Sequence, residues 1–209
     1  MHPAIPAAQT EKDALCATAR WCCARGWVPA TSGNFSVRAG HAIWITPSGI
    51  DKGTLQPEDL LEADLEGRVP AGSPRPSAET ILHVVLYRQR AQARAILHVH
   101  SIWNTILSER FAPGGYLPLE GYELLKALSG VETHMHLERV PVIDNSQDYA
   151  ALAHAFEDAL ATHPAAHGVL LNRHGLYTWG QSVAEARRHL EALEFLFEVE
   201  GRRLLAAQV

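Results

Sequence analysis

The sequence predicts a mixed α/β domain in which a sheet of several short strands is covered by helices on its faces. Short apolar segments alternate with longer segments that carry apolar residues at helical spacing, and this alternation is typical of that class. The composition, with 47% hydrophobic and 20% charged residues, is that of a folded globular protein. Because 209 residues suffice for one core, we expect a single domain over residues 1–209, with its core at about 10–200.

The first half of the chain alternates the two kinds of segment. Apolar residues recur at helical spacing until Gly26, and turn residues at 32–34 and 40–41 then bracket a predicted hairpin. A surface loop rich in Pro and Gly precedes Ser77, the expected N-cap of the next helix. The expected elements are helices at about 9–25 and 77–90, a helical turn at 56–59, and strands at 35–38, 42–46, 60–64 and 95–99.

The second half continues the alternation and ends in a long helix. A loop rich in Gly and Pro is expected at 111–119, and Gly175 permits a tight turn between two apolar strands. Ser182 and Glu185 have the spacing of a capping box, which predicts the start of the last helix. The expected elements are helices at about 101–108, 120–128, 146–161 and 182–205, and strands at 139–143, 168–172 and 176–179.

Charge and composition limit the partners. The formal net charge is -5, from 18 Lys+Arg and 23 Asp+Glu, which disfavours a general nucleic-acid binder but leaves a local anion site open. The N-terminal segment lacks the regions of a secretory signal, and no stretch reaches the roughly 18 apolar residues of a membrane span, so we expect a cytoplasmic protein without membrane contact. Cys16, Cys22 and Cys23 are expected to be reduced packing residues.

Histidine is the unusual residue, with 12 copies. His98 and His100 end an apolar strand, where residues two apart share a face with Cα atoms roughly 6.5 Å apart, so their imidazoles can bind one cation. His174, in a tight turn, is a candidate third ligand, and three ligands with an open position are typical of a catalytic zinc site. The alternatives are ordinary polar residues at a strand end and in a turn, and a rival site at His134 and His136 with the same spacing.

Two glutamates are candidate functional residues. Glu79 lies in the first turn of a predicted helix, where it either stabilises the helix dipole or contacts a metal or substrate. Glu123 lies on the predicted helix at 120–128, where it is either part of an ordinary amphipathic helix or a general acid or base that faces a cleft.

Two loops have the composition of anion-binding turns. Thr31-Ser32-Gly33-Asn34 and Thr46-Pro47-Ser48-Gly49 each combine hydroxyl or amide groups with a glycine that exposes backbone N–H groups. Lys52 follows the second loop. The pair can therefore hold a single phosphate without a long basic segment, or the two loops are simply structural turns.

These segments, in this order, resemble the class II aldolase/adducin family. The motifs that carry the resemblance, over about residues 10–200, are Thr31–Ser36, Thr46–Gly49, Pro76–Glu79, His98–Ser101 and Arg173–Gly175. It implies a three-layer α/β/α domain with a central mixed, largely antiparallel sheet, usually in a homotetramer. It also implies a divalent cation, zinc or another metal, at His98, His100 and His174. The residues it assigns to a sugar-phosphate substrate are Ser32, Gly33, Asn34, Ser48, Gly49, Lys52 and Ser77.

Within the family, four segments are most similar to the hydro-lyases that act on 5-methylthioribulose 1-phosphate in methionine salvage, namely 30–34, 48–53, 100–108 and 121–126. That similarity implies Glu123 as the acid/base residue. Glu79 lies where the family's aldolases have a carboxylate ligand, which some of its dehydratases lack. The alternatives are an aldolase or 4-epimerase acting on fuculose, rhamnulose or ribulose phosphates, and a non-catalytic adducin-like module, which has no need of an open metal site.

Overall fold

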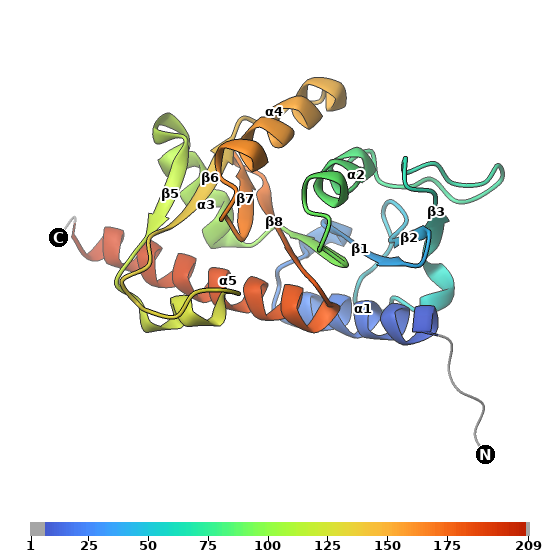
Figure 1. The fold of residues 1–209 in the computed structure, drawn as a ribbon, viewed down its shortest axis with the longest axis horizontal. Helices are drawn as coiled ribbons and strands as arrows, with labels where there is room; N and C mark the ends of the chain where they lie inside the picture. Colours follow the sequence, from blue (N-terminus) through green and yellow to red (C-terminus); the bar gives the residue numbers. More distant parts are fainter. Residues whose placement is uncertain (1–6, 208–209) are drawn as a thin grey trace, which may run out of the picture.

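The computed structural model describes residues 7–207, so the extreme ends of the predicted domain lie outside the described residues. An eight-stranded sheet forms the middle layer of this part of the chain (Figure 1), with the strand order β3-β2-β1-β4-β8-β7-β6-β5. Only β6 and β7 pair in parallel, which confirms a mixed, largely antiparallel sheet. The strands are β1 Asn34–Ala39, β2 Ala42–Ile45, β3 Leu61–Ala63, β4 Ala95–Val99, β5 Tyr116–Leu119, β6 Glu138–Ile143, β7 Gly168–Leu171 and β8 Gly175–Gly180.

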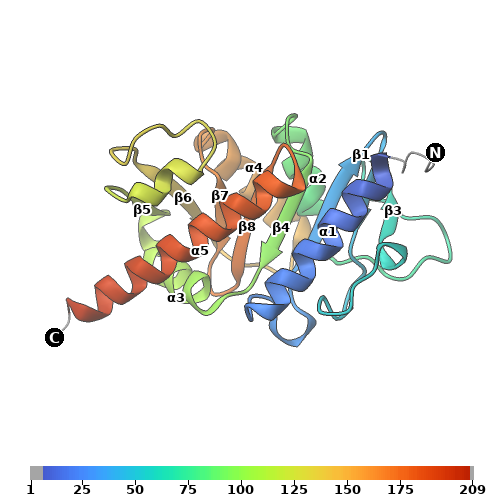
Figure 2. The same ribbon diagram turned by 90° about the horizontal axis from the view of Figure 1, so that it is seen from below.

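Helices cover both faces of the sheet. In Figures 1 and 2, α1 and α5 run along one face, and α2 and α4 lie over the other; α3 packs against α5. This confirms the three-layer α/β/α architecture. Among residues 7–207, no helix combines the length and apolar character needed to cross a membrane. The helices are α1 Ala7–Ala24, α2 Thr80–Gln89, α3 Ile102–Phe111, α4 Tyr149–Thr162 and α5 Val183–Ala206, with short 3-10 helices η1 Pro29–Thr31, η2 Pro57–Asp59, η3 Ala112–Gly114 and η4 Glu123–Ala127.

The central strand β4 divides the hydrophobic core into two halves. Its alternating side chains Ala95, Leu97 and Val99 pack with residues of α1 and α5. Ile96 packs with residues of α2 and α4 on the opposite face. His98 follows the parity of Ile96 and therefore points towards the α2 layer, which determines which elements surround it.

Strand β5 lies where the sequence predicts a loop. Tyr116–Leu119 pairs with β6 alone, at the end of the sheet. Pro118 lowers the expectation of a strand because it cannot donate a ladder hydrogen bond, but an edge strand tolerates proline. The prediction of a loop over 111–119 is therefore wrong for its second half.

Three of the predicted helices differ from the structure in their first residue or in their type. The expected helix at 120–128 is only the 3-10 helix Glu123–Ala127, which buries Leu125 alone and follows Gly121 in a left-handed conformation with φ of 81°. Ser77 is not an N-cap, because α2 begins at Thr80. The helix expected from residue 146 begins at Tyr149, after the N-cap Asp148. Ser182 is the predicted N-cap of α5, and its hydroxyl accepts the Glu185 N–H.

Candidate metal centre

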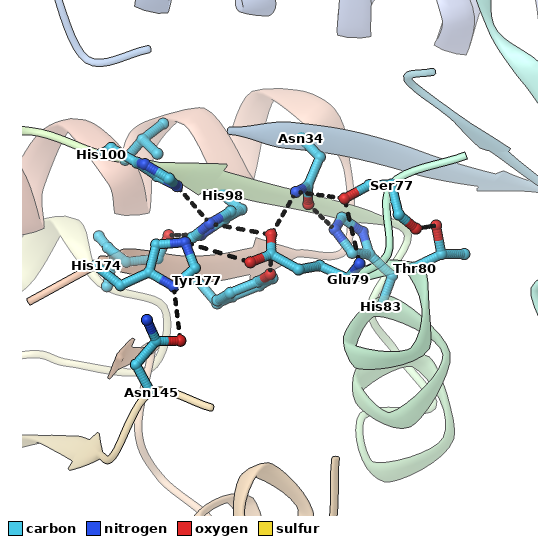
Figure 3. A network of polar contacts seen from close by, with 12 residues as sticks. Asn34, Ser77, Glu79, Thr80, His83, His98, His100, Asn145, His174 and Tyr177 are labelled. Atoms are coloured by element: carbon cyan, nitrogen blue, oxygen red, sulfur yellow. Dashed lines mark hydrogen bonds and ion pairs between the residues drawn. The ribbon is translucent and has the colours of Figure 1, made fainter. Parts of the chain in front are cut away.

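Three histidines converge at one edge of the sheet. His98 is in β4 and His100 directly follows it, while His174 lies in the turn that joins β7 and β8. Because β8 pairs with β4, this turn brings His174 beside the other two (Figure 3). One ligand nitrogen from each imidazole lies within 4.8 Å of the other two, and no other such trio of His, Cys, Asp or Glu is found in the described part of the chain. The structure therefore brings together the three predicted ligands.

A glycine and a strained residue permit this convergence. A Cβ atom on Gly175 would lie 2.3 Å from the Val99 carbonyl oxygen and about 3 Å from ring atoms of both His98 and His100. Arg173 adopts a left-handed conformation with φ of 55°, which is uncommon for a residue other than glycine. The turn is therefore fitted closely against the end of β4.

The three imidazoles have the protonation state that a cation requires. Burial lowers the pKa of His98 well below its usual value, that of His100 to about 4, and that of His174 as well. His98 Nδ1 lies 3.0 Å from the Leu176 carbonyl oxygen, so Nδ1 carries the proton and the Nε2 lone pair faces His100 Nε2, 2.8 Å away. Neutral imidazoles with converging nitrogen atoms fit a divalent cation.

Glu79 faces the same nitrogen atoms. Its Oε1 lies 3.2 Å from His174 Nε2, and its Oε2 lies 3.4 Å from His98 Nε2. The carboxylate is only 12% exposed and accepts hydrogen bonds from Asn34 Nδ2 at 2.7 Å and the Tyr177 hydroxyl at 3.0 Å. Glu79 is the N-cap residue of α2, so its backbone begins the helix while its side chain contacts the histidines. Of the two roles left open by the sequence, contact with the metal-binding side chains has a direct structural basis.

The first predicted anion loop passes directly beside the histidines. Gly33 has φ of 72°, and a Cβ there would lie 2.5 Å from the His98 carbonyl oxygen, so only glycine fits. Ala30 and Thr31 also have positive φ, and turns of this kind present backbone N–H groups to anions. The buried Ser32 hydroxyl has no hydrogen-bond partner among the residues described. The loop thus has a polar group that a ligand can satisfy.

Lys52, which follows the second loop in the sequence, contacts the first loop. Its side chain is 2% exposed, and its Nζ donates to the Thr31 carbonyl oxygen at 2.6 Å. Burial lowers its pKa to about 8. Ser48 and Gly49 form a turn at the surface, where Gly49 has φ of 75° and the Ser48 N–H donates to the Arg75 carbonyl. A buried ammonium near an unpartnered hydroxyl is a favourable environment for an anion.

Asn34 and Ser77 lie behind Glu79 and form part of its hydrogen-bond network. Asn34 is 4% exposed and contacts Glu79, His83 and the Ser77 hydroxyl. The Ser77 hydroxyl also accepts the Glu79 N–H at 3.2 Å. Their described contacts thus serve the carboxylate, and the Asn34 amide is already committed to protein partners.

Glu123 is not brought to the histidines within one chain. Its side chain is 72% exposed, and its ionic partners are Lys126 and His134 Nδ1, the latter at 3.8 Å. The Lys126 ammonium lowers the pKa of the Glu123 carboxyl. The 3-10 helix that carries Glu123 packs against α5, whereas Glu79 begins α2 on the other face of the sheet.

The rival histidine pair does not form a metal site. His134 faces Glu123, whereas His136 Nε2 contacts Glu138 Oε2 at 2.9 Å, so the two imidazoles have different partners. Sequence reasoning also missed two residues of the network around the histidines. His83 is four residues beyond Glu79 on the same helix face, and Tyr177 is the direct partner of His98 in the sheet register. The spacing of four residues could have indicated His83, whereas Tyr177 is identified only by the pairing of β4 with β8.

Two relatives of similar sequence are named as dehydratases. A protein of Methylococcus capsulatus named methylthioribulose-1-phosphate dehydratase is 49% identical over 195 residues, which cover 93% of this chain and 94% of that protein. A protein of the same name from Marinobacter nauticus is 46% identical and covers 91% of this chain and 92% of its own.

Solved structures share the fold. The L-fuculose-1-phosphate aldolase of Thermus thermophilus superposes with a TM-score of 0.77 at 29% identity, over 97% of this chain and 99% of that one. A sugar-phosphate aldolase of Thermotoga maritima, at 18% identity, gives a TM-score of 0.73 over 94% and 96% of the two chains. The model of the Class II Aldolase and Adducin N-terminal domain matches residues 13–200. The chain therefore belongs to the class II aldolase and adducin family.

Proposed function

We propose that this protein is a hydro-lyase of methionine salvage that dehydrates 5-methylthioribulose 1-phosphate to 2,3-diketo-5-methylthiopentyl 1-phosphate and water. The observation that carries the proposal is the convergence of three neutral imidazoles beside a buried carboxylate, close to a loop with a buried ammonium and an unpartnered hydroxyl. The relatives that are 46–49% identical are named for this dehydration and support it over aldol cleavage. The aldolase of known structure, at 29% identity, supports the alternative only weakly.

His98, His100 and His174 are the residues that would hold a divalent cation, for which we propose zinc. When bound there, such a cation supplies Lewis acidity, which is worth several kcal/mol for an enediolate formed from the C2 ketone. Glu79, which faces two of the three ligand nitrogens, fixes the orientation of these imidazoles or completes the ligand set.

The substrate phosphate is placed between the two loops. The Lys52 ammonium and the Ser32 hydroxyl supply the buried donors, and the turns that contain Gly33 and Gly49 add backbone N–H groups. Ser48 is assigned to the same phosphate site as part of the second turn, and Asn34 and Ser77 support the site through Glu79. Because the first loop lies next to His98, a phosphate bound there holds the reacting carbons of the substrate close to the histidines.

Replacement of Lys52 by Met tests the phosphate position. We expect KM for the sugar phosphate to rise about 10- to 100-fold, the effect of losing one charged hydrogen bond, with a smaller change in kcat. Steady-state kinetics of Lys52→Met and the control Lys52→Arg check this. A KM that stays at the wild-type value in Lys52→Met would contradict the assignment.

Glu123 is proposed to move the protons. It removes the C3 proton, and the protonated carboxyl then donates to the C4 hydroxyl as it leaves as water, after which the enol product tautomerises to the diketone. Since Glu123 is exposed and lies on the α5 side of its own chain, this role requires that a neighbouring copy in a homotetramer brings Glu123 to the histidines.

We also propose that the protein acts in the cytoplasm.

Mixed oligomers test the sharing of a site. We expect Glu123→Gln and His98→Ala to be inactive separately, and activity to return when the two are unfolded and refolded together, because some sites then contain an intact Glu123 and an intact His98. A Glu123→Gln protein that binds zinc and has full activity would remove Glu123 from the mechanism. Inactive mixtures would place both residues in one chain.

The substrate assay decides the reaction. Zinc-loaded protein is incubated with 5-methylthioribulose 1-phosphate and, separately, with fuculose 1-phosphate, and diketone formation is compared with aldehyde release. We expect diketone from the first and no aldehyde from the second. Aldehyde release without diketone would establish the aldolase alternative, and protein that holds no cation and converts neither compound would favour a non-catalytic module.

A further inference from the structure

A chain of buried polar side chains runs from Glu79 into the space between β1 and α2. Asn34 Nδ2 lies 2.7 Å from Glu79 Oε2, and Asn34 Oδ1 lies 2.5 Å from His83 Nε2 (Figure 3). His83 Nδ1 lies 2.7 Å from Ser36 Oγ, which lies 2.9 Å from the Tyr87 hydroxyl. His83 and Ser36 are fully buried, and Asn34 and Tyr87 are each 4% exposed. These four side chains are therefore too buried for water to satisfy their polar groups, and their hydrogen bonds with one another take that role.

The chemistry of the partners gives each hydrogen bond one direction. The Glu79 carboxylate accepts, so Asn34 must present its NH2 group to Glu79 and its carbonyl oxygen to His83. That oxygen also only accepts, so His83 must carry a proton on Nε2. Burial lowers the pKa of His83 to about 3, so the ring is neutral and its Nδ1 has no proton. Ser36 must then donate to Nδ1, and Tyr87 donates to Ser36.

A second donor reaches the same carboxylate oxygen from the other side. The Tyr177 hydroxyl donates to Glu79 Oε2 at 3.0 Å, and the Tyr177 ring stacks on His98 with centroids 3.9 Å apart and planes inclined by 12°. Oε2 is therefore held between Asn34 and Tyr177, which leaves Oε1 opposite His174 Nε2. Asn34 can hold Oε2 only while its amide keeps the orientation that the hydrogen bond from His83 imposes.

We propose that His83 is a positioning residue for Glu79, because its Nε2 proton fixes the Asn34 amide so that the NH2 group holds the Glu79 carboxylate against His98 and His174. The inference rests on the proposed function, since it takes these histidines to be the cation site. It assigns His83 a role in the site although it contacts none of the three candidate ligands. Loss of such an outer partner typically lowers metal affinity or activity 10- to 100-fold.

Two replacements of His83 separate its two nitrogens. Glutamine places an N–H near the position of Nε2 and can still donate to Asn34, whereas asparagine places its amide near Nδ1 and leaves Asn34 Oδ1 without its donor. Tyr87→Phe is the matched control, because it removes the far end of the chain without touching Asn34. The readouts are zinc affinity of the apoprotein by calorimetry, the visible absorption spectrum of the cobalt-loaded protein, kcat and KM, and thermal unfolding.

We expect His83→Asn to weaken zinc binding or lower kcat about 10- to 100-fold and to change the cobalt spectrum, whereas His83→Gln and Tyr87→Phe stay close to wild type. Wild-type zinc affinity and turnover in His83→Asn would overturn the inference. So would equal losses in all three variants that follow their loss of thermal stability, since these would indicate packing alone. If the wild-type protein binds no cation, the proposed function fails instead, and this outcome is visible before any variant is made.

The wild-type protein gives a test that does not depend on the folding of variants. A neutron crystal structure locates the ring proton of His83 and the orientation of the Asn34 amide. We expect the proton on Nε2 and the NH2 group towards Glu79. A proton on Nδ1 with none on Nε2 would overturn the inference, since His83 would then have no donor for Asn34.

Discussion

Two groups of three histidines each have one imidazole hydrogen-bonded to the same strand, β8, but the groups differ in the chemistry of their other partners. The first histidine cluster is His98, His100 and His174. The second histidine cluster is His136, His167 and His189. Each uses a carbonyl oxygen of β8: His98 Nδ1 contacts that of Leu176 at 3.0 Å, and His189 Nδ1 contacts that of Trp179 at 2.7 Å. In both cases the carbonyl fixes the tautomer of the imidazole.

Four of the five remaining ring nitrogen atoms of the second cluster have protein partners. His167 Nδ1 lies 3.1 Å from Glu138 Oε2, and His167 Nε2 lies 2.9 Å from the Ser129 carbonyl oxygen. Both partners only accept hydrogen bonds, so His167 carries two protons and a positive charge, and the Glu138 carboxylate raises its pKa against the effect of burial. His136 contacts the same carboxylate, and His189 Nε2 accepts the Ser129 N–H. This cluster is a closed ion-pair network.

In the first cluster the nitrogen atoms face one another, and Glu79 is the acidic group beside them. A cavity does not identify the metal-binding region, because a cavity of about 570 Å³ lies over the second cluster and is lined by its three histidines. What distinguishes them is whether the imidazole lone pairs already have partners. Histidine number and cavity volume are therefore poorer guides to a metal site here than the direction of each hydrogen bond.

The largest expected effect tests this distinction directly. We expect His174→Ala to lower zinc affinity by about 100-fold or more, because loss of a direct ligand costs at least as much as loss of an outer partner. His136→Ala, its control in the second cluster, should bind zinc as the wild type does. Calorimetry and metal analysis measure both. Zinc lost from His136→Ala, or retained fully by His174→Ala, would reverse the roles of the clusters.

The free energy of unfolding should depend on the second cluster, whereas zinc affinity should not. Glu138 is 1% exposed, and its replacement by Gln leaves the His167 charge buried without its partner, so we expect a loss of about 3 kcal/mol of unfolding free energy with zinc affinity unchanged. Glu109→Gln, which breaks an exposed ion pair with Arg173, should cost less than about 1 kcal/mol. Denaturant unfolding of both apoproteins compares the two values. Equal losses would show that the second cluster does not stabilise the fold.

Local sequence patterns proposed the first cluster as one candidate site among alternatives, and the family resemblance selected its three histidines. Alternation along β4 places His98 and His100 on one face, and Gly175 marks a turn that can bring His174 close to them. The same patterns predicted most strands, since each is short and apolar. Pro118 concealed β5, because whether a proline is tolerated depends on its being at a sheet edge, which local sequence does not specify.

The surroundings of that cluster depend on contacts between distant segments. Glu79 and His174 meet only because β1, β4 and β8 are neighbours in the sheet and α2 packs over them. Lysine side chains are rarely buried, yet Lys52 is buried beside the first loop. No local pattern predicts that Glu123 lies on the α5 side, because the choice of face depends on how the segment after β5 packs.

The smallest expected effect is a difference in pH dependence between two neighbours in the second cluster. His167 has a raised pKa in the fold, so its stabilising contribution is fully present below about pH 6.5 and is lost as the pH rises through its folded pKa. Burial lowers the pKa of His189 to about 4, so His189 costs stability as the pH falls from 6.5 towards 4, by about 1 kcal/mol at pH 5.5.

Replacement of each by Gln should therefore give opposite trends in the unfolding free energy. The loss caused by His167→Gln should be larger at pH 5.5 than at pH 8.5, because only the protonated imidazole pairs with Glu138. The loss caused by His189→Gln should be smaller at pH 5.5, because the variant no longer has to keep a buried imidazole neutral. Denaturant unfolding of the apoproteins at both pH values measures the two trends. Parallel trends would contradict a charged His167 beside a neutral His189, and with it the description of the second cluster as an ion-pair network.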